Sequence, residues 1–209
     1  MQSRLFYWGI DLATKPEGDS TVITILEGLN NPIIQYQYKT ILLKEIKGVD
    51  LQDQWNLIKE LAKVYSPAKM KIDETGIGMQ LGQLAEKEFS ESVAEGIHLT
   101  MLLKDAIISN FRSFLEVARN TGIKKIILPN NPEMINQILS LEREISLTDV
   151  PKYHHPDVPN AHDDYVWSIA LACWGAKQAE GKTMMITNLA TLPARDIKKE
   201  IEEAQKLKV

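Results

Sequence analysis

Cysteine and long apolar runs are nearly absent from this sequence, and each absence excludes a class of protein. Cys173 is the single cysteine among 209 residues, so the chain can form neither an internal disulfide nor a cysteine-based metal site. No run approaches the roughly 18 apolar residues of a transmembrane helix, and the opening residues MQSRLFYWG lack the apolar segment of a signal peptide. We therefore expect a cytoplasmic protein with no membrane partner.

An excess of basic residues is also missing. The chain carries 24 Lys and Arg residues against 28 Asp and Glu residues, which gives a formal net charge of −4. Because phosphate backbones are bound through clustered Lys and Arg, this balance argues against a protein that grips DNA strongly by itself. It does not argue against an enzyme whose acidic centre works only once a metal ion is bound.

The rest of the composition is 44% hydrophobic and 25% charged, which is typical of a globular protein with a substantial core. The length suits one domain, which we place at residues 1–190, followed by a charged helical tail at residues 191–209. Three apolar, β-branched segments separated by short turns, at residues 5–12, 20–28 and 33–43, predict an antiparallel meander of three strands.

Strand and helix patterns alternate after the meander. Asp50 is a suitable N-cap for a helix that begins at Leu51. Further along, the sequence predicts short strands at 70–73, 96–100 and 124–129, helices from the TGIG glycines to Phe89 and at 102–120, 133–145 and 162–180, and an irregular segment at 148–161. This order predicts an α/β fold with a mixed sheet, in which three antiparallel strands lead into parallel strands and helices flank the faces.

Carboxylates lie at the ends of three of these elements. Asp11 ends the first strand in YWGIDLA, Asp73 ends a strand in KMKIDETGIG, and Asp163 and Asp164 open the last helix in NAHDDYVWSIALA. Ligands gather at strand ends in such sheets, so the fold can bring these residues together. Clustered carboxylates repel one another unless a cation lies among them, and oxygen ligands suit Mg²⁺ or Mn²⁺. The pattern favours metal-assisted chemistry on a phosphodiester.

Each candidate ligand has a structural alternative. Asp11 and Asp73 could cap the turn or helix that follows them, and the 163–164 pair could stabilise a helix N-terminus. Neighbouring helical residues point roughly 100° apart, so the two members of the pair cannot aim identically at one ion. Asp163 shares a helix face with Val166 and Ala170, which favours Asp163 as the inner ligand without settling the choice.

Four other residues are candidates for supporting roles. Asp19 lies in the turn after the first strand, where it could fold over the site or form an ordinary Asx turn. Glu74 could join Asp73 or cap the next helix. Lys104 could contact a phosphate or remain a solvated lysine, and His162 could support a ligand or carry a proton.

Taken in order, five segments of the chain resemble the C-terminal nuclease domain of the large terminase subunit of tailed viruses. They are GIDLATKPEGDSTV, KIDETGIG, LTMLLKDAIISNF, KKIILP and HDDYVWSIALA, and they span about residues 7–176. The resemblance implies an RNase H-like fold and an endonuclease that cuts double-stranded viral DNA during genome packaging, in the host cytoplasm, with two divalent ions, Mg²⁺ or Mn²⁺. It also implies that Asp11, Asp73, Asp163 and Asp164 are the acidic ligands.

The sequence departs from that family in two respects. One is its acidic charge balance, which argues against a strong grip on DNA without the ATPase, portal or small subunit. The other is the ATPase: the full-length terminase carries an N-terminal packaging ATPase, and this chain has no phosphate-binding loop of the full pattern Gly-x-x-x-x-Gly-Lys-Ser/Thr. We therefore expect an excised nuclease domain or a free-standing relative, with DNA, a packaging ATPase domain, the small terminase subunit and the portal as partners. Three alternatives stay open: another RNase H-like nuclease such as a Holliday-junction resolvase, an actin-like ATPase, and a non-catalytic packaging module.

Overall fold

The computed structural model describes residues 4–13, 20–29, 36–75, 78–116, 124–145, 151–155 and 162–191. The chain divides into two compact units, residues 1–176 and residues 177–209, and the fold described below is that of the first unit. Within the described ranges, no helix is long and apolar enough to cross a membrane. Apart from its first residue, the predicted tail at 191–209 lies outside them, so the separate tail stays a prediction.

A six-stranded mixed sheet forms the centre of the first unit. Its strands are β1 (Leu5–Asp11), β2 (Thr21–Gly28), β3 (Tyr36–Ile46), β4 (Pro67–Asp73), β5 (Ala94–Ile97) and β6 (Lys124–Ile127), in the order β5-β4-β1-β2-β3-β6. The first three strands pair antiparallel as predicted, whereas β4 pairs parallel with β1, β5 with β4, and β6 with β3.

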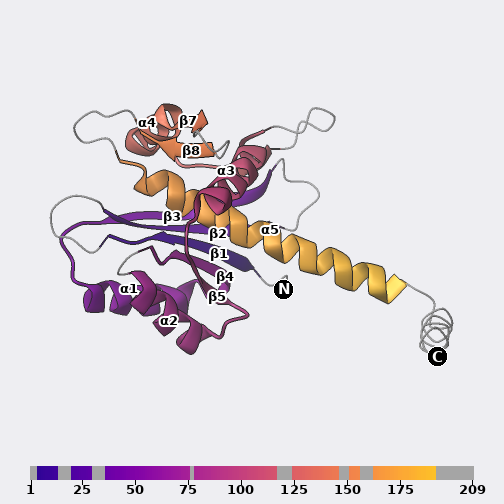
Figure 1. The fold of residues 1–209 in the computed structure, drawn as a ribbon. Coiled ribbons are helices and arrows are strands. Elements are labelled where there is room, and N and C mark those ends of the chain that lie inside the picture. Colours follow the sequence, from indigo (N-terminus) through magenta and orange to yellow (C-terminus); the bar gives the residue numbers. More distant parts are fainter. Residues whose placement is uncertain are drawn as a thin grey trace, which may run out of the picture. The chain divides into compact units, whose positions relative to one another are not determined.

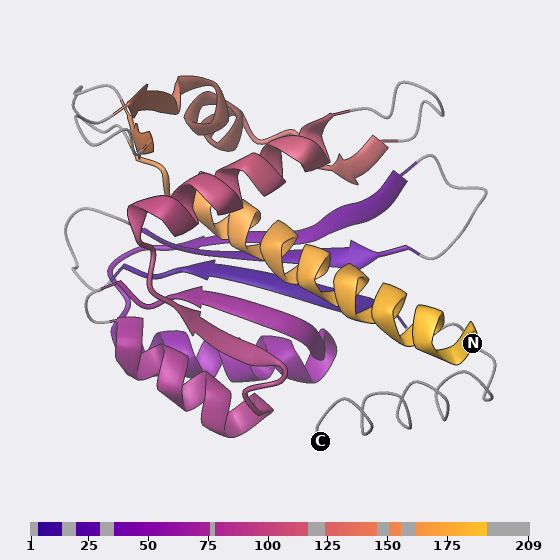
Figure 2. The same cartoon turned by 45° about the vertical axis from the view of Figure 1, so that its right-hand side comes forward.

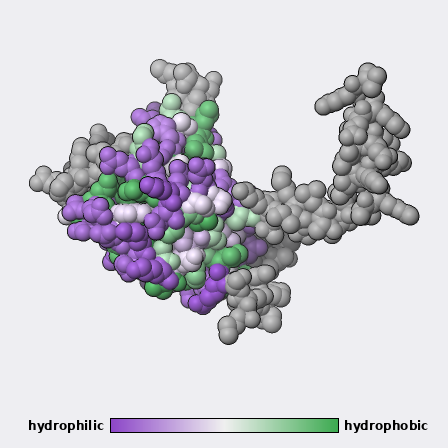
Figure 3. Space-filling view, turned by 90° about the horizontal axis from the view of Figure 1, so that it is seen from below, coloured by the Kyte–Doolittle hydropathy of each residue, from purple (hydrophilic) through white to green (hydrophobic). Residues whose placement is uncertain are grey.

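Helices cover both faces of this sheet (Figures 1 and 2). Helices α1 (Leu51–Val64) and α2 (Gly78–Phe89) lie on one face. Helix α3 (Met101–Leu115) lies on the other, together with α5 (Asp164–Thr191) up to Ala176, where the first unit ends. Because side chains alternate along a strand, each strand contributes one set of residues to each face. Seen from the α1–α2 side, the described surface mixes hydrophilic residues with small hydrophobic patches (Figure 3).

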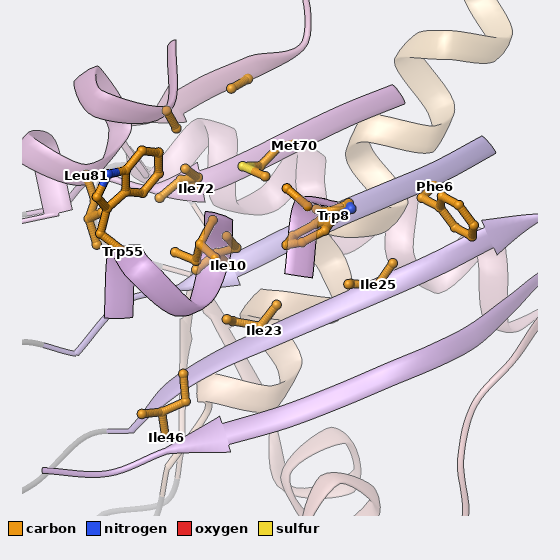
Figure 4. Close-up of a cluster of buried hydrophobic side chains, with 14 residues drawn as sticks. Phe6, Trp8, Ile10, Ile23, Ile25, Ile46, Trp55, Met70, Ile72 and Leu81 are labelled. Carbon is orange, nitrogen blue, oxygen red and sulfur yellow. The ribbon is translucent and has the colours of Figure 1, made fainter. Parts of the chain in front are cut away.

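One hydrophobic core lies between the sheet and the α1–α2 layer. Phe6, Trp8 and Ile10 of β1 point into it together with apolar residues of the neighbouring strands, and Trp55 and Leu81 close it from the helices (Figure 4). The predicted first helix is confirmed, since the Asp50 side chain accepts a hydrogen bond from the Asp53 backbone N–H at 2.9 Å. The opposite face of β1 carries the buried Tyr7 and also Gly9, which meets the backbone of α5.

Four predictions for individual segments are wrong. The helix predicted at 133–145 ends at Ser140 as α4 (Pro132–Ser140), and the chain continues as β7 (Glu142–Ile145). That strand pairs antiparallel with β8 (Pro151–His154), inside the segment predicted to be irregular. The helix predicted at 102–120 ends at Leu115 because Glu116 is already extended, and residues 117–123 lie outside the described ranges. The short strand predicted at 96–100 lies at Ala94–Ile97 instead.

Candidate active site

Asp11 and Asp73 lie side by side at the C-terminal ends of β1 and β4, which are neighbouring strands in the interior of the sheet. Strand β4 runs parallel to β1 with Ile72 opposite Ile10, so the next residue on each strand is one of these aspartates. Both carboxylates are half-buried. They belong to the sheet face that points away from α1 and α2, because Ile10 and Ile72 point into the core beneath those helices and side chains alternate. Two strand ends thus deliver two carboxylates to the face that α5 covers.

The close approach of α5 to β1 depends on Gly9. A Cβ atom at this position would overlap the Ser168 carbonyl oxygen and the Ala172 backbone nitrogen. A buried hydrogen bond of 2.8 Å between the hydroxyls of Thr24 and Ser168 adds a polar link from β2 to the same helix. These contacts fix where α5 crosses the sheet, and therefore where its first residues lie relative to Asp11.

Asp163 and Asp164 stand at the start of α5 in different surroundings. Asp164 is buried, with 7% of its surface exposed, and its Oδ2 accepts a hydrogen bond of 3.0 Å from the Ser20 backbone N–H. Asp163 is half-buried, and its Oδ2 accepts a hydrogen bond of 2.8 Å from the Trp167 indole N–H. The two neighbouring carboxylates are therefore held by different elements of the fold.

The negative charges of the other three aspartates all act on the Asp11 carboxyl. Burial raises the pKa of the Asp11 carboxyl well above its usual value, and the negative charges of Asp73, Asp164 and Asp163 raise it further, in that order. The ammonium group of Lys104 acts in the opposite direction and lowers the pKa. Lys104 is half-buried, and its Nζ lies 4.8 Å from the centroid of the Trp167 ring.

The capping role weighed for Asp73 is also present. Its Oδ1 accepts hydrogen bonds from the Thr75 backbone N–H at 2.8 Å and from the Thr75 hydroxyl at 2.6 Å, which closes the turn after β4. Glu74 points elsewhere: its carboxylate packs where a Cβ atom on Gly82 or Gly96 would lie, between α2 and β5. The structure thus separates Glu74, which supports the α2–β5 packing, from the group around Asp11.

His162 and Asp19 are the two remaining candidates. His162 is half-buried directly before Asp163. Asp19 lies outside the described residues, and its role stays a prediction.

A buried polar network that the sequence does not reveal holds the two ends of the β1–β2 connection. The Gln54 side chain donates to the carbonyl oxygens of Ala13 at 3.1 Å and Val49 at 2.8 Å, and it accepts from the Thr21 hydroxyl at 2.8 Å. The Ala13 backbone N–H donates to that same hydroxyl oxygen at 2.8 Å. Gln54 occupies a buried helix position where the apolar pattern predicts a hydrophobic residue, and this mismatch is the only sequence feature that indicates it.

The donor chemistry of the four aspartates fits a hard divalent cation. They provide oxygen ligands only, two of them at strand ends and two at a helix start, and their mutual repulsion at Asp11 is what a bound cation would relieve. Among the described residues, no group of three or more acidic, His or Cys side chains is already close enough to hold an ion.

Solved structures share this fold over most of the chain, although no family model and no curated protein matches the sequence. The large terminase nuclease of thermophilic phage G20c, with bound magnesium, matches with a TM-score of 0.62 at 18% identity, over 83% of this chain and 82% of that one. The nuclease domain of the large terminase subunit of bacterial virus Sf6 matches with a TM-score of 0.60 at 9% identity, over 81% and 87%.

These likenesses confirm the predicted RNase H-like fold, and they confirm the resemblance to terminase nuclease domains at the level of the fold. The phage G20c nuclease is also known with bound cobalt and with bound zinc, and a variant of the Sf6 domain with manganese and β-thujaplicinol.

Proposed function

We propose that this protein is a metal-dependent endonuclease of the terminase kind, which cuts double-stranded DNA during viral genome packaging. The observation that carries the proposal is that three aspartates, Asp73 of β4 and the 163–164 pair at the start of α5, all act on the charge of the half-buried Asp11 carboxyl at the end of β1. The fold shared with terminase nuclease domains supports it, as do the divalent ions bound in those neighbours.

In this proposal Asp11 is the central ligand, because each of the other three aspartates acts on its charge. Asp73, from β4, and the 163–164 pair, from the start of α5, complete the ligand set. Two divalent ions, Mg²⁺ or Mn²⁺, would supply an activated water and would stabilise the leaving oxygen of the phosphodiester. Lys104 would contact the phosphate or reduce the charge of the acidic group, since its ammonium already acts on Asp11.

Plasmid cleavage tests the proposal directly. The wild-type chain should nick and linearise plasmid DNA in the presence of Mn²⁺ or Mg²⁺ and should lose this activity in EDTA. Asp11→Asn removes the central charge with little change in volume, and it should reduce cleavage by at least 100-fold, the order of loss seen when a group that stabilises the transition state is removed. Asp53→Asn, on the exposed surface of α1, is the matched control and should cut as well as the wild type.

Equal cleavage by the wild type and Asp11→Asn would rule out the assignment. A strong preference for four-way junctions over linear duplex would favour a resolvase. A chain that hydrolyses ATP without cutting DNA would favour the actin-like alternative, and a chain that neither binds metal nor cuts would favour a non-catalytic packaging module. Partners such as a packaging ATPase domain, the small terminase subunit and the portal belong to the same proposal.

A further inference from the structure

Trp167 makes two contacts with the candidate site that hydrophobic packing does not require. Its indole N–H donates to Oδ2 of Asp163 at 2.8 Å, and the Lys104 ammonium lies 4.8 Å from its ring centroid. The residue itself is buried, with 3% of its surface exposed. One side chain therefore contacts both a carboxylate of the site and a lysine whose charge acts on Asp11.

The chemistry of an indole suits both contacts at once. An aromatic ring carries partial positive charge at its edge and partial negative charge on its face. The N–H edge therefore attracts the Asp163 carboxylate, while the face attracts the Lys104 ammonium. The spacing also fits, because Asp163 and Trp167 are four residues apart, and side chains at that spacing meet on a helix.

The hydrogen bond determines which way the Asp163 carboxylate can turn. With Oδ2 held by the indole, rotation of the carboxylate is restricted, and Oδ1 accepts no hydrogen bond from the described part of the chain. A carboxylate that binds a metal through one oxygen is commonly oriented by a hydrogen bond to the other, and losing such a bond typically weakens metal binding 10- to 100-fold.

We propose that Trp167 is a positioning residue of this nuclease, which orients Asp163 for a divalent ion through its indole N–H and holds Lys104 beside the carboxylates through its ring face. The inference rests on the proposed function, since it assumes that the four aspartates bind metal. It assigns a role to a residue that the sequence alone treats as a member of the hydrophobic core.

Two substitutions separate the two contacts. Trp167→Phe removes the N–H donor and keeps an aromatic face, so calorimetric titration should show Mn²⁺ affinity reduced by about 10- to 100-fold, with cleavage partly restored at high Mn²⁺. Trp167→Leu removes the face as well, so its cleavage at saturating Mn²⁺ should also fall. Adding Lys104→Met to Trp167→Leu should then cause less further loss than Lys104→Met causes in the wild type.

Trp8→Phe is the matched control. Trp8 is fully buried in the core on the opposite face of β1, and its indole N–H also donates to an oxygen at 3.0 Å, the Tyr65 carbonyl. It should lower the melting temperature as Trp167→Phe does, yet leave Mn²⁺ affinity unchanged. If Trp167→Phe binds Mn²⁺ as tightly as the wild type, the positioning role is overturned while the proposed function stands. If the wild type binds no Mn²⁺ and cuts no DNA, the proposed function fails, and the role fails with it.

Discussion

Asp11 is the residue at which burial and charge act together against ionisation. Its carboxyl is half-buried at the end of β1, and three other aspartates raise its pKa further. Such a group destabilises the fold when it is charged and unpaired. The ionised Asp11 carboxyl therefore lowers the free energy of unfolding of the metal-free protein, whether or not substrate is present.

This cost predicts that Asp11→Asn stabilises the metal-free protein at neutral and alkaline pH. The pKa of Asp11 is raised in the folded protein, so protonated Asp11 contributes stability. This contribution is fully present below the pKa of Asp in the unfolded chain, about 3.9. It is lost as the pH rises through the pKa of Asp11 in the folded protein. We expect the variant to melt higher than the wild type at pH 8, by roughly 2–4 °C for each kcal/mol of cost removed. At pH 4 the two proteins should melt close together.

Thermal unfolding in EDTA at both pH values checks this prediction. Asp50→Asn is a suitable control, because Asn and Asp are equally good N-caps for α1 and the position is exposed. Adding Mg²⁺ at pH 8 should reverse the order, since only the wild type keeps the central ligand. A metal-free Asp11→Asn protein that melts lower than the wild type at pH 8 would contradict the electrostatic argument.

The two aspartates of α5 should differ in their effects on substitution. Helical periodicity favours Asp163 as the inner ligand, but the structure gives Asp164 the larger effect on Asp11 and the buried hydrogen bond to Ser20. We expect Asp164→Ala to lose more cleavage than Asp163→Ala and to lose about 1.5–3 kcal/mol of unfolding free energy, the usual worth of a hydrogen bond to a charged group. Cleavage across a Mn²⁺ titration and urea unfolding measure both effects, and a reversed order would restore Asp163 as the inner ligand.

The sequence could identify the candidate ligands but could not rank this pair. Asp11 and Asp73 stand out because a carboxylate at the end of an apolar strand is costly to desolvate, and the 163–164 pair stands out because it adds a third acidic position to that set. Helical periodicity fails for the ranking because α5 is buried from Asp164 to Cys173 without interruption. A helix that is apolar all round presents no exposed face from which to count. The polar role proposed for Trp167 could not be predicted for the same reason, since this residue lies inside the same uninterrupted buried stretch.

At the scale of the elements, β1 and α5 must touch without a side chain between them, and Gly9 allows this contact. We expect Gly9→Ala to cost at least the 1–3 kcal/mol that is typical of an overpacked core, because its Cβ would meet backbone atoms of Ser168 and Ala172, which cannot rotate away. Cleavage should fall more steeply than stability, since displacing α5 displaces both of its aspartates.

Gly28→Ala is the matched control for this substitution. It also lies in a strand, but the nearest atom to its added Cβ belongs to the Tyr7 side chain, at 3.0 Å, which can shift. Denaturant unfolding and cleavage at saturating Mn²⁺ should show a small change for Gly28→Ala and a large one for Gly9→Ala. Wild-type cleavage by Gly9→Ala would show that the position of α5 does not set the site.

The strands of the meander and the helix after Asp50 were predictable because their residues alternate or recur with the period of the element. The β7–β8 hairpin was not. All four residues of β7 are exposed, so no burial pattern distinguishes this strand from the end of the preceding helix. Its structure comes from pairing with residues 151–154, a contact between segments that local patterns do not encode.

At the scale of the whole molecule, the charge balance limits how the chain can hold DNA. A net charge of −4 leaves little capacity to release counterions from a phosphate backbone. We expect the isolated chain to bind duplex DNA with a dissociation constant above about 1 µM at physiological salt, within the usual range for non-specific binding. Fluorescence anisotropy across a salt series measures this, and sub-micromolar binding without partners would show that the surface carries an effective basic patch.

The backbone contact at Gly9 also has a consequence for how this protein can change over time. Where two elements meet through side chains, their spacing alters whenever a core residue is exchanged. Here the spacing between β1 and α5 is set by main-chain atoms, on the face that lies away from the Trp8 core. Residues of that core can therefore be exchanged, with gains or losses of stability, while the carboxylates keep their separation. One face of the sheet can therefore vary in sequence, while the opposite face fixes the separation of the carboxylates.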